Sequence, residues 1–177
     1  MSGEGNVVGR IAAAEPSGWL WLPLALGVVL ADQLVKRLVV GHLTPFTPLH
    51  VLPVLDFTLM FNKGAAFSFL AEASGWQRWA FIVLAAAVAV VIVGWLRRLR
   101  ARSQALLACS LTLILGGACG NVIDRLRLGY VVDFIHAHWN GAYFPAFNVA
   151  DAAITIGAAL LLIDAWRESR ETKRAGA

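Results

Sequence analysis

Charged residues are scarce in this sequence of 177 residues: Asp, Glu, Lys and Arg together make up 15% of it. Soluble domains average about 25% charged and about 45–50% apolar residues, whereas apolar residues here reach 59%. The mean hydropathy is +0.69. A water-soluble globule of this composition would have too little polar surface to cover itself, which excludes most soluble folds. The composition predicts a membrane protein.

Cysteine is nearly absent as well. Cys109 and Cys119 lie ten residues apart in one apolar segment, which on a helix is about 15 Å of rise, so they cannot form a disulfide with each other. The sequence also has no Cys/His cluster with metal-ligand spacing. His136 and His138 form the nearest approach to one, and because no third ligand can be named for them we expect no metal there.

Four apolar segments are long enough to cross a hydrocarbon core of about 30 Å as helices. They lie at about 19–40, 79–96, 105–123 and 146–166. We expect the polar residues 1–18 to form a flexible leader and not a cleaved signal peptide, because Arg10 is their only basic residue and no A-x-A site follows. The whole chain is expected to be one integral membrane domain.

Basic residues exceed acidic ones by 15 to 11, but the surplus is concentrated at two places, which argues against a nucleic-acid-binding face. Four arginines lie between the second and third helices, and further basic residues lie in the tail, 167–177. The positive-inside rule places both segments in the cytoplasm. Both termini are then cytoplasmic, and residues 42–78 and 124–143 face outward.

The first outward segment contains two short apolar and aromatic stretches, Phe57 to Phe61 and Phe67 to Phe69. They flank Asn62-Lys63-Gly64, a sequence typical of a turn. We therefore expect a small hairpin at the membrane surface.

Polar residues in or near the membrane core gather toward the outward side. A carboxylate there costs several kcal/mol, so such residues are functional candidates by default. They predict a polar cluster at the outer mouth of the helix bundle, and its members are Asp32, Asn121, Asp124, Asp133, Asn148 and Asp151.

Several of these residues also have a purely structural explanation. Asp32 and Lys36 are four residues apart on one helical face and can neutralise each other. Asp124 and the adjacent Arg125 could form a water-facing pair, or Arg125 could turn inward to bind a substrate carbonyl. Asn148 and Asp151 lie one helical turn apart, which also suits the capping of a helix N-terminus.

Asp133 and Asp151 have no evident basic partner nearby in the sequence. Two carboxylates that meet in a low-dielectric site cannot both ionise easily, so the pair holds one proton and can act as acid and base together. This chemistry suits peptide hydrolysis, in which one carboxylate takes a proton from water while the other polarises an amide carbonyl. Paired membrane carboxylates suit proton or cation transport equally well.

Four stretches, in order and spanning residues 32 to 151, together resemble the lipoprotein signal peptidases of bacteria, the type II signal peptidases. They are Asp32-Gln33-x-x-Lys36, Asn62-x-Gly64-Ala65-Ala66-Phe67-Ser68, Gly116-Gly117-Ala118-x-Gly120-Asn121-x-x-Asp124-Arg125-x-x-x-Gly129-x-Val131-Val132-Asp133-Phe134 and Phe147-Asn148-x-Ala150-Asp151.

The resemblance implies an aspartyl endopeptidase that removes the signal peptide from a prolipoprotein after its cysteine has received diacylglycerol, cutting before that cysteine. It implies an all-α membrane fold of four transmembrane helices, with a small extracytoplasmic β-cradle at about 42–70 and a short outer helix at about 135–143. The location would be the inner membrane of a bacterium. A small proton- or cation-coupled transporter is the alternative, and a noncatalytic lipoprotein-binding scaffold is a third.

The resemblance also implies roles for individual residues. Asp133 and Asp151 would be the catalytic pair. The substrate-binding residues would be Asn62, Asn121, Arg125 and Asn148, and the supporting residues would be Asp32, Lys36, Asp124 and Gly64. No metal or organic cofactor is needed, because the pair supplies both acid and base. The expected partners are diacylglyceryl-prolipoproteins and membrane lipid, without nucleic acid, and the chain is expected to be a monomer.

Overall fold

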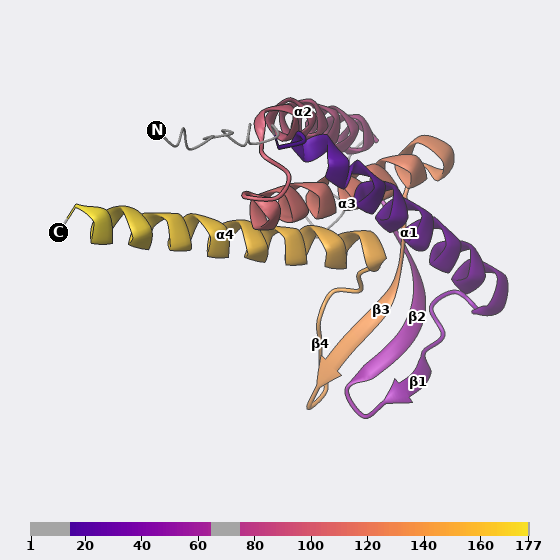
Figure 1. The fold of residues 1–177 in the computed structure, drawn as a ribbon. Helices are drawn as coiled ribbons and strands as arrows, with labels where there is room; N and C mark the ends of the chain where they lie inside the picture. The colour runs from indigo at the N-terminus through magenta and orange to yellow at the C-terminus, as the bar shows by residue number, and fades with distance from the viewer. Residues whose placement is uncertain (1–14, 65–74, 177) are drawn as a thin grey trace, which may run out of the picture.

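The computed structural model describes residues 15–64 and 75–176, and four of its helices are long and apolar enough to cross a membrane. They are α1 (Leu22–His42), preceded by the short 3-10 helix η1 (Gly18–Trp21), α2 (Trp76–Arg98), α3 (Ala105–Leu128) and α4 (Val149–Ala175). The predicted four spans are therefore confirmed. Helix α4 continues past the expected end at 166, and Figure 1 shows it extending beyond the bundle.

Helix α3 lies at the centre of the bundle and packs against the other three (Figure 1). Glycines allow this close approach. A Cβ added to Gly116 would lie 2.8 Å from the Ala25 carbonyl oxygen of α1, and one added to Gly117 would collide with the Ala150 carbonyl of α4. Small residues bring helices together in this way where no hydrophobic effect drives their association.

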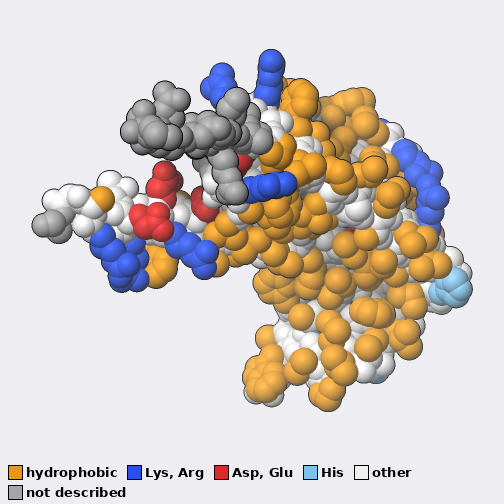
Figure 2. All heavy atoms as spheres, viewed as in Figure 1, with side chains coloured by type: hydrophobic (Ala, Val, Ile, Leu, Met, Phe, Trp, Pro, Cys, Tyr) orange, Lys and Arg blue, Asp and Glu red, His pale blue; other side chains and the backbone are white. Residues whose placement is uncertain are grey.

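The exterior of the bundle is apolar. Leu26, Leu30 and Leu34, four residues apart along α1, are each about 60% exposed. Figure 2 shows hydrophobic side chains over most of the visible surface of the bundle and the sheet, whereas the protruding part of α4 carries charged side chains. A lipid environment explains this surface, because acyl chains impose no penalty on exposed leucine.

Residues 15–18 were expected to belong to a flexible leader, and that expectation is wrong for them. Ser17 pairs with Arg100, and the Gly18 amide donates a 2.9 Å hydrogen bond to the Leu99 carbonyl. The start of α1 is thus held against the arginine-containing connection between α2 and α3. Residues 1–14 lie outside the described residues.

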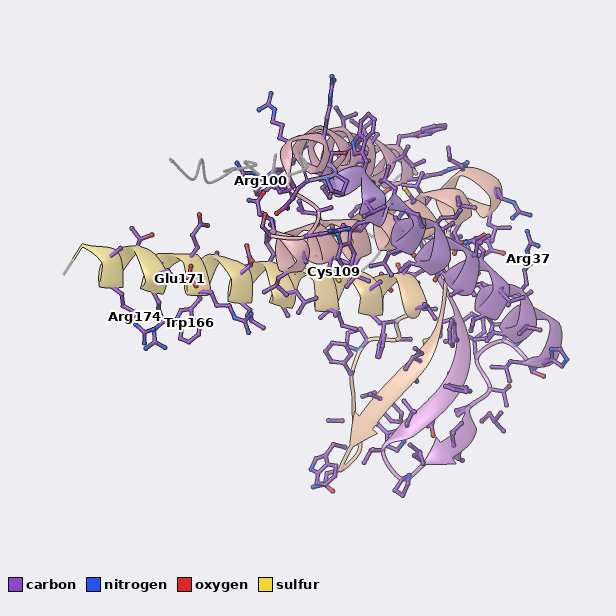
Figure 3. All side chains as sticks on the ribbon, in the orientation of Figure 1. Arg37, Arg100, Cys109, Trp166, Glu171 and Arg174 are labelled. Carbon is purple, nitrogen blue, oxygen red and sulfur yellow. The ribbon has the colours of Figure 1, made fainter. Side chains whose placement is uncertain are left out.

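Arginine residues lie toward both ends of the molecule. Figure 3 shows Arg100 and Arg174 toward the end from which α4 extends, and Arg37 toward the other end. The arginine-containing connection between α2 and α3 is therefore remote from the end of α1 that leads into the sheet.

An antiparallel sheet joins the bundle where α1 and α3 end and α4 begins (Figure 1). Its order is β1-β2-β3-β4, with β1 at Leu49–Leu52, β2 at Leu55–Asn62, β3 at Val131–Trp139 and β4 at Ala142–Tyr143. Strands β1 and β2 lie within the segment expected to form the cradle, about 42–70, whereas β3 and β4 lie outside it.

The expected outer helix at 135–143 is wrong, because these residues form most of β3 and all of β4. Phe57 of β2 pairs with Ile135, and Trp139 pairs with Ala142 across Asn140-Gly141. Both turn residues have positive φ, 48° and 80°. Asn-Gly in this conformation joins two strands tightly, and pairing with β2 satisfies the backbone of β3.

The expected hairpin turn at Asn62–Gly64 also differs from the observed one. Phe57 to Phe61 does lie in a strand, β2, but β2 pairs with β1 on one edge and β3 on the other. The β1–β2 turn lies at Pro53 and Val54. The second expected stretch, Phe67 to Phe69, lies outside the described residues.

Candidate active site

Asp133 lies on β3 and is only 2% exposed, so its carboxyl group depends on protein partners. Two side-chain amides supply them: Asn62 Nδ2 donates to Oδ2 at 3.0 Å, and Asn148 Nδ2 donates to Oδ1 at 2.7 Å. The donors come from β2 and from the start of α4. Three separate chain segments therefore meet at this one carboxyl group.

Asp151 lies in the first turn of α4, within a capping box. The Asn148 side chain accepts a hydrogen bond from the Asp151 backbone amide at 2.8 Å, and the Asp151 carboxylate accepts one from the Asn148 amide. The capping arrangement considered from the sequence is therefore confirmed. Asn121 Nδ2 of α3 also donates to Asp151 Oδ1 at 2.8 Å.

Asn148 links the two aspartates. Its buried amide donates to Asp133, while its side-chain oxygen and backbone amide both engage Asp151. The same Nδ2 lies 3.2 Å from Asn121 Oδ1. The helix cap is thus also the connection that places the first turn of α4 beside β3.

The environment of Asp133 makes its carboxyl group easier to protonate than that of an exposed aspartate. Burial raises the pKa of its carboxyl group, the hydrogen bond from Asn62 lowers it, the negative charge of Asp151 raises it, and the hydrogen bond from Asn148 lowers it. The balance raises the pKa of Asp133 to about 6. A carboxyl group with this pKa can hold a proton much closer to neutrality than an exposed aspartate can.

A buried lysine, Lys36, lies next to the pair formed by Asp133 and Asp151. Lys36 Nζ is 2.9 Å from Asp32 Oδ2 and 2.8 Å from Asp124 Oδ2, and it donates to Asn121 Oδ1 at 3.1 Å. The expected neutralisation of Asp32 by Lys36 is confirmed. Asp124 pairs with Lys36, so the water-facing pair of Asp124 with Arg125 is wrong.

The two carboxylates that flank Lys36 also hold backbone groups. Asp32 Oδ1 accepts a hydrogen bond from the Ala150 amide at 2.9 Å, and Asp124 Oδ2 accepts one from the Val132 amide at 3.1 Å. Ala150 and Val132 each directly precede a member of the aspartate pair. The lysine cluster therefore fixes the backbone next to both Asp133 and Asp151.

Gln33 belongs to the same cluster, although sequence reasoning assigned it no role. Its Nε2 lies 2.9 Å from Asp124 Oδ1 and 3.3 Å from Asp32 Oδ2. The available signal was its position directly after Asp32 in the first of the matching stretches.

Arg125 is half-buried beside the pair, with its guanidinium group 4.8 Å from the centre of the Phe81 ring. Its Nη1 donates a long hydrogen bond to the Asn121 carbonyl at 3.4 Å. Its charge interacts with those of Asp151 and Asp133, yet no ion pair within 4.0 Å joins it to a carboxylate among residues 15–64 and 75–176. Most of its donors therefore remain available to another molecule.

Gly64 orients Asn62. The Gly64 amide donates to Asn62 Oδ1 at 2.8 Å, which leaves Asn62 Nδ2 to bind Asp133. Gly64 has a φ of +96°, and a Cβ added to it would lie 2.9 Å from the Phe81 ring. Only glycine suits this position on both grounds.

Comparisons with known proteins agree on one family. The profile of the signal peptidase (SPase) II family matches residues 24–167. The lipoprotein signal peptidase of Ectopseudomonas mendocina is 49% identical over 157 residues, covering 88% of this chain and 92% of that protein. The lipoprotein signal peptidase of Pseudomonas aeruginosa is 48% identical over 159 residues, covering 89% and 92%.

Two solved structures described as bacterial membrane enzymes have the same fold. One has a TM-score of 0.74 at 30% identity and covers 85% of this chain and 89% of its own. The other has a TM-score of 0.73 at 29% identity and covers 85% and 95%.

Proposed function

The chain belongs to the signal peptidase II family of bacterial membrane proteases, and we propose that it cleaves prolipoproteins by an aspartic mechanism with Asp133 and Asp151 as the catalytic pair. The observation that carries the proposal is the link through Asn148, whose side-chain amide donates to the Asp133 carboxyl group while its backbone amide donates to the Asp151 carboxylate. Family membership does not support the transporter alternative.

The two carboxyl groups divide the chemistry between them. Asp133, whose pKa is raised to about 6, holds the shared proton and donates it toward the carbonyl oxygen of the scissile bond. Asp151 accepts a proton from a water molecule, whose oxygen attacks the carbonyl carbon. When the tetrahedral intermediate collapses, the C–N bond breaks, the leaving nitrogen takes the proton held by Asp151, and a hydroxyl group of the intermediate returns a proton to Asp133.

The amides around the pair divide into two groups. Asn121 and Asn148 already donate to the carboxyl groups, which supports a role in positioning the pair more than in binding substrate. Arg125 has uncommitted donors beside the pair, which supports its expected role of binding a substrate carbonyl. Asn62 donates to Asp133 and is only half-buried, which supports its expected role of also contacting the peptide.

The lysine cluster is proposed to support the site from below. Lys36 lies between Asp32 and Asp124, and these carboxylates in turn bind the backbone amides next to the catalytic residues. A carboxylate left unpaired at such a buried place would be costly, so the cluster works only as a unit.

The proposed topology places both termini in the cytoplasm and the aspartate pair toward the outer face. The arginine-containing connection between α2 and α3 lies away from the sheet-bearing end, which supports this orientation through the positive-inside rule. The proposed substrate is the diacylglyceryl form of a prolipoprotein, cut before the modified cysteine. Its acyl chains would remain in the membrane beside the apolar surface of the bundle, and the enzyme would act as a monomer.

Cleavage of a diacylglyceryl-modified prolipoprotein by the purified chain tests the proposal. Asp133→Asn and Asp151→Asn should each abolish the shortened product, because asparagine keeps the size of the side chain but not the proton. The double variant should be scarcely worse than either single variant, since the pair acts as one unit. Asp164→Asn is the matched control, because Asp164 lies on α4 about 20 Å of helical rise from Asp151. Substantial turnover by either single variant would contradict the assignment.

A further inference from the structure

Three metal-ligating side chains meet on the sheet, away from the aspartate pair. His50 lies on β1, Asp56 on β2 and His138 on β3. His50 and Asp56 are directly opposed across β1 and β2, and Asp56 is opposed to His136, two residues before His138 on the same face of β3. Because His138 is five residues from Asp133, the two sites are about 17 Å apart along the strand.

The ligand atoms converge on one point. Asp56 Oδ1 lies 2.6 Å from His50 Nδ1 and 3.3 Å from His138 Nε2, and one ligand atom from each residue lies within 4.8 Å of both others. Ligands held at about 2.0–2.1 Å by a tetrahedral zinc ion lie about 3.3 Å from one another. Asp56 Oδ1 and His138 Nε2 already have this spacing, whereas His50 Nδ1 lies closer to Asp56 Oδ1 and would have to move outward.

Two of the atoms lack hydrogen-bond partners. Asp56 is fully buried, and its Oδ2 has no hydrogen-bond partner among the described residues. The same is true of His138 Nε2, whose approach to Asp56 lacks hydrogen-bond geometry. Buried polar atoms are rarely left in this state. A cation at this point would give His138 Nε2 a partner, and a carboxylate that binds the cation through both oxygens would also engage Asp56 Oδ2.

The ligand set determines the class of ion. Two imidazole nitrogens and one carboxylate suit a divalent transition-metal ion such as zinc, whereas magnesium and calcium prefer ligands that are all oxygen. His136 does not join the set, because its Nδ1 faces Thr58 Oγ1 at 3.4 Å. The side chain of His50 is 78% exposed, which leaves a route for the ion from solvent.

We propose that His50, Asp56 and His138 form a binding site for a zinc-like ion that links β1, β2 and β3, with its fourth coordination position taken by water. All four residues of β1 are exposed, and β1 forms one edge of the four-stranded sheet. The ion would therefore attach the exposed edge strand β1 to the strand that carries Asp133. This site is separate from the proposed catalytic pair and supplies no step of peptide hydrolysis.

Titration of the untagged, metal-stripped full chain with zinc chloride, followed by calorimetry in detergent micelles, tests the site. We expect one zinc ion per chain and no binding of magnesium under the same conditions. His50→Gln and His138→Gln should each weaken zinc binding by about 100-fold or more, since loss of an outer-shell partner alone costs about 10–100-fold. His42→Gln is the matched control, because His42 is an exposed histidine on α1.

Amide hydrogen exchange provides a second readout that does not depend on activity. Zinc should slow exchange in β1 of the unmodified chain and not in His50→Gln, which removes an exposed side chain and should leave the fold intact. The absence of stoichiometric zinc binding would overturn the proposal. So would zinc binding that His50→Gln leaves unchanged, and in either case the three residues would form a hydrogen-bonded cluster only.

Discussion

Removal of the Asn62 amide should shift the pH dependence of cleavage. Asn62 Nδ2 donates to Asp133 Oδ2 at 3.0 Å, and this bond opposes the rise in the pKa of Asp133 that burial causes. The bond favours the ionised carboxylate, so Asn62→Ala should raise the pKa of Asp133 above about 6. The proposed mechanism requires Asp133 to be protonated and Asp151 ionised, so activity should fall as pH rises through the pKa of Asp133.

The size of the shift follows from the strength of the bond. A hydrogen bond to a charged group contributes about 1.5–3 kcal/mol, and one pKa unit corresponds to about 1.4 kcal/mol. Asn62 is only half-buried, so water can replace part of the lost bond. We therefore expect the pKa to rise by about one unit, from about 6 to about 7. At neutral pH the protonated fraction would increase from about one tenth to about one half.

The assay is the pH dependence of kcat/KM for cleavage of a diacylglyceryl-prolipoprotein. The alkaline limb should move upward by about one pH unit in Asn62→Ala, even if the maximal rate falls because a substrate contact is lost. Lys63→Ala is the control, since Lys63 is the exposed neighbour of Asn62. A lower rate with an unmoved alkaline limb would refute the reasoning, because Asn62 would then act on the substrate alone. The alkaline limb reports an apparent pKa of the Asp133–Asp151 pair and not of one residue, because the two carboxyl groups interact.

Three further predictions follow from packing, buried charge and substrate positioning. Gly120→Ala should destabilise the protein by about 1–3 kcal/mol in thermal unfolding, because its Cβ would lie 2.7 Å from Asp32 Oδ2, whereas Gly27→Ala, with open space around it, should not. Lys36→Met should lower the free energy of unfolding by about 3–5 kcal/mol in the same assay, because it leaves Asp32 and Asp124 buried without a counter-charge. An unchanged midpoint of thermal unfolding would contradict the role of the lysine cluster. An unlipidated precursor should be cut about a hundredfold more slowly than the diacylglyceryl form, and Arg125→Ala should slow both; equal rates for the two precursors would show that the acyl chains do not position the bond.

The sequence was most informative where the physical signal is local. A helix that crosses lipid satisfies its own backbone hydrogen bonds, so a long apolar run suffices to identify it. The same solvent makes a buried carboxylate costly, which singled out the polar residues that the structure brings together at the sheet-bearing end of the bundle. The Asp32–Lys36 pair and the Asn148 cap were also readable, because both lie within one helical turn.

The sequence was misleading where a segment's conformation depends on its partner. Residues 135–143 were expected to form a helix. Instead, residues 135–137 pair with β2, which lies more than seventy residues earlier in the chain, and residues 138–139 pair with β4. The Asn140-Gly141 turn is a local hairpin signal, and it was available in the sequence. The choice of β1 as the other neighbour of β2 had no comparable signal.

The sequence by itself determined that the protein lies in a lipid bilayer, how many helices span it and which residue types form the candidate site. Each of these follows from composition or from spacing along one helix. Only the tertiary structure decided which groups bind each other. It alone placed Asn148 between Asp133 and Asp151, with its side-chain amide on the first and its backbone amide on the second, and it brought Asp124 to Lys36. It also gathered His50, Asp56 and His138 from three strands. Contacts between distant segments depend on how helices and strands pack together, and no spacing within a single segment encodes that packing.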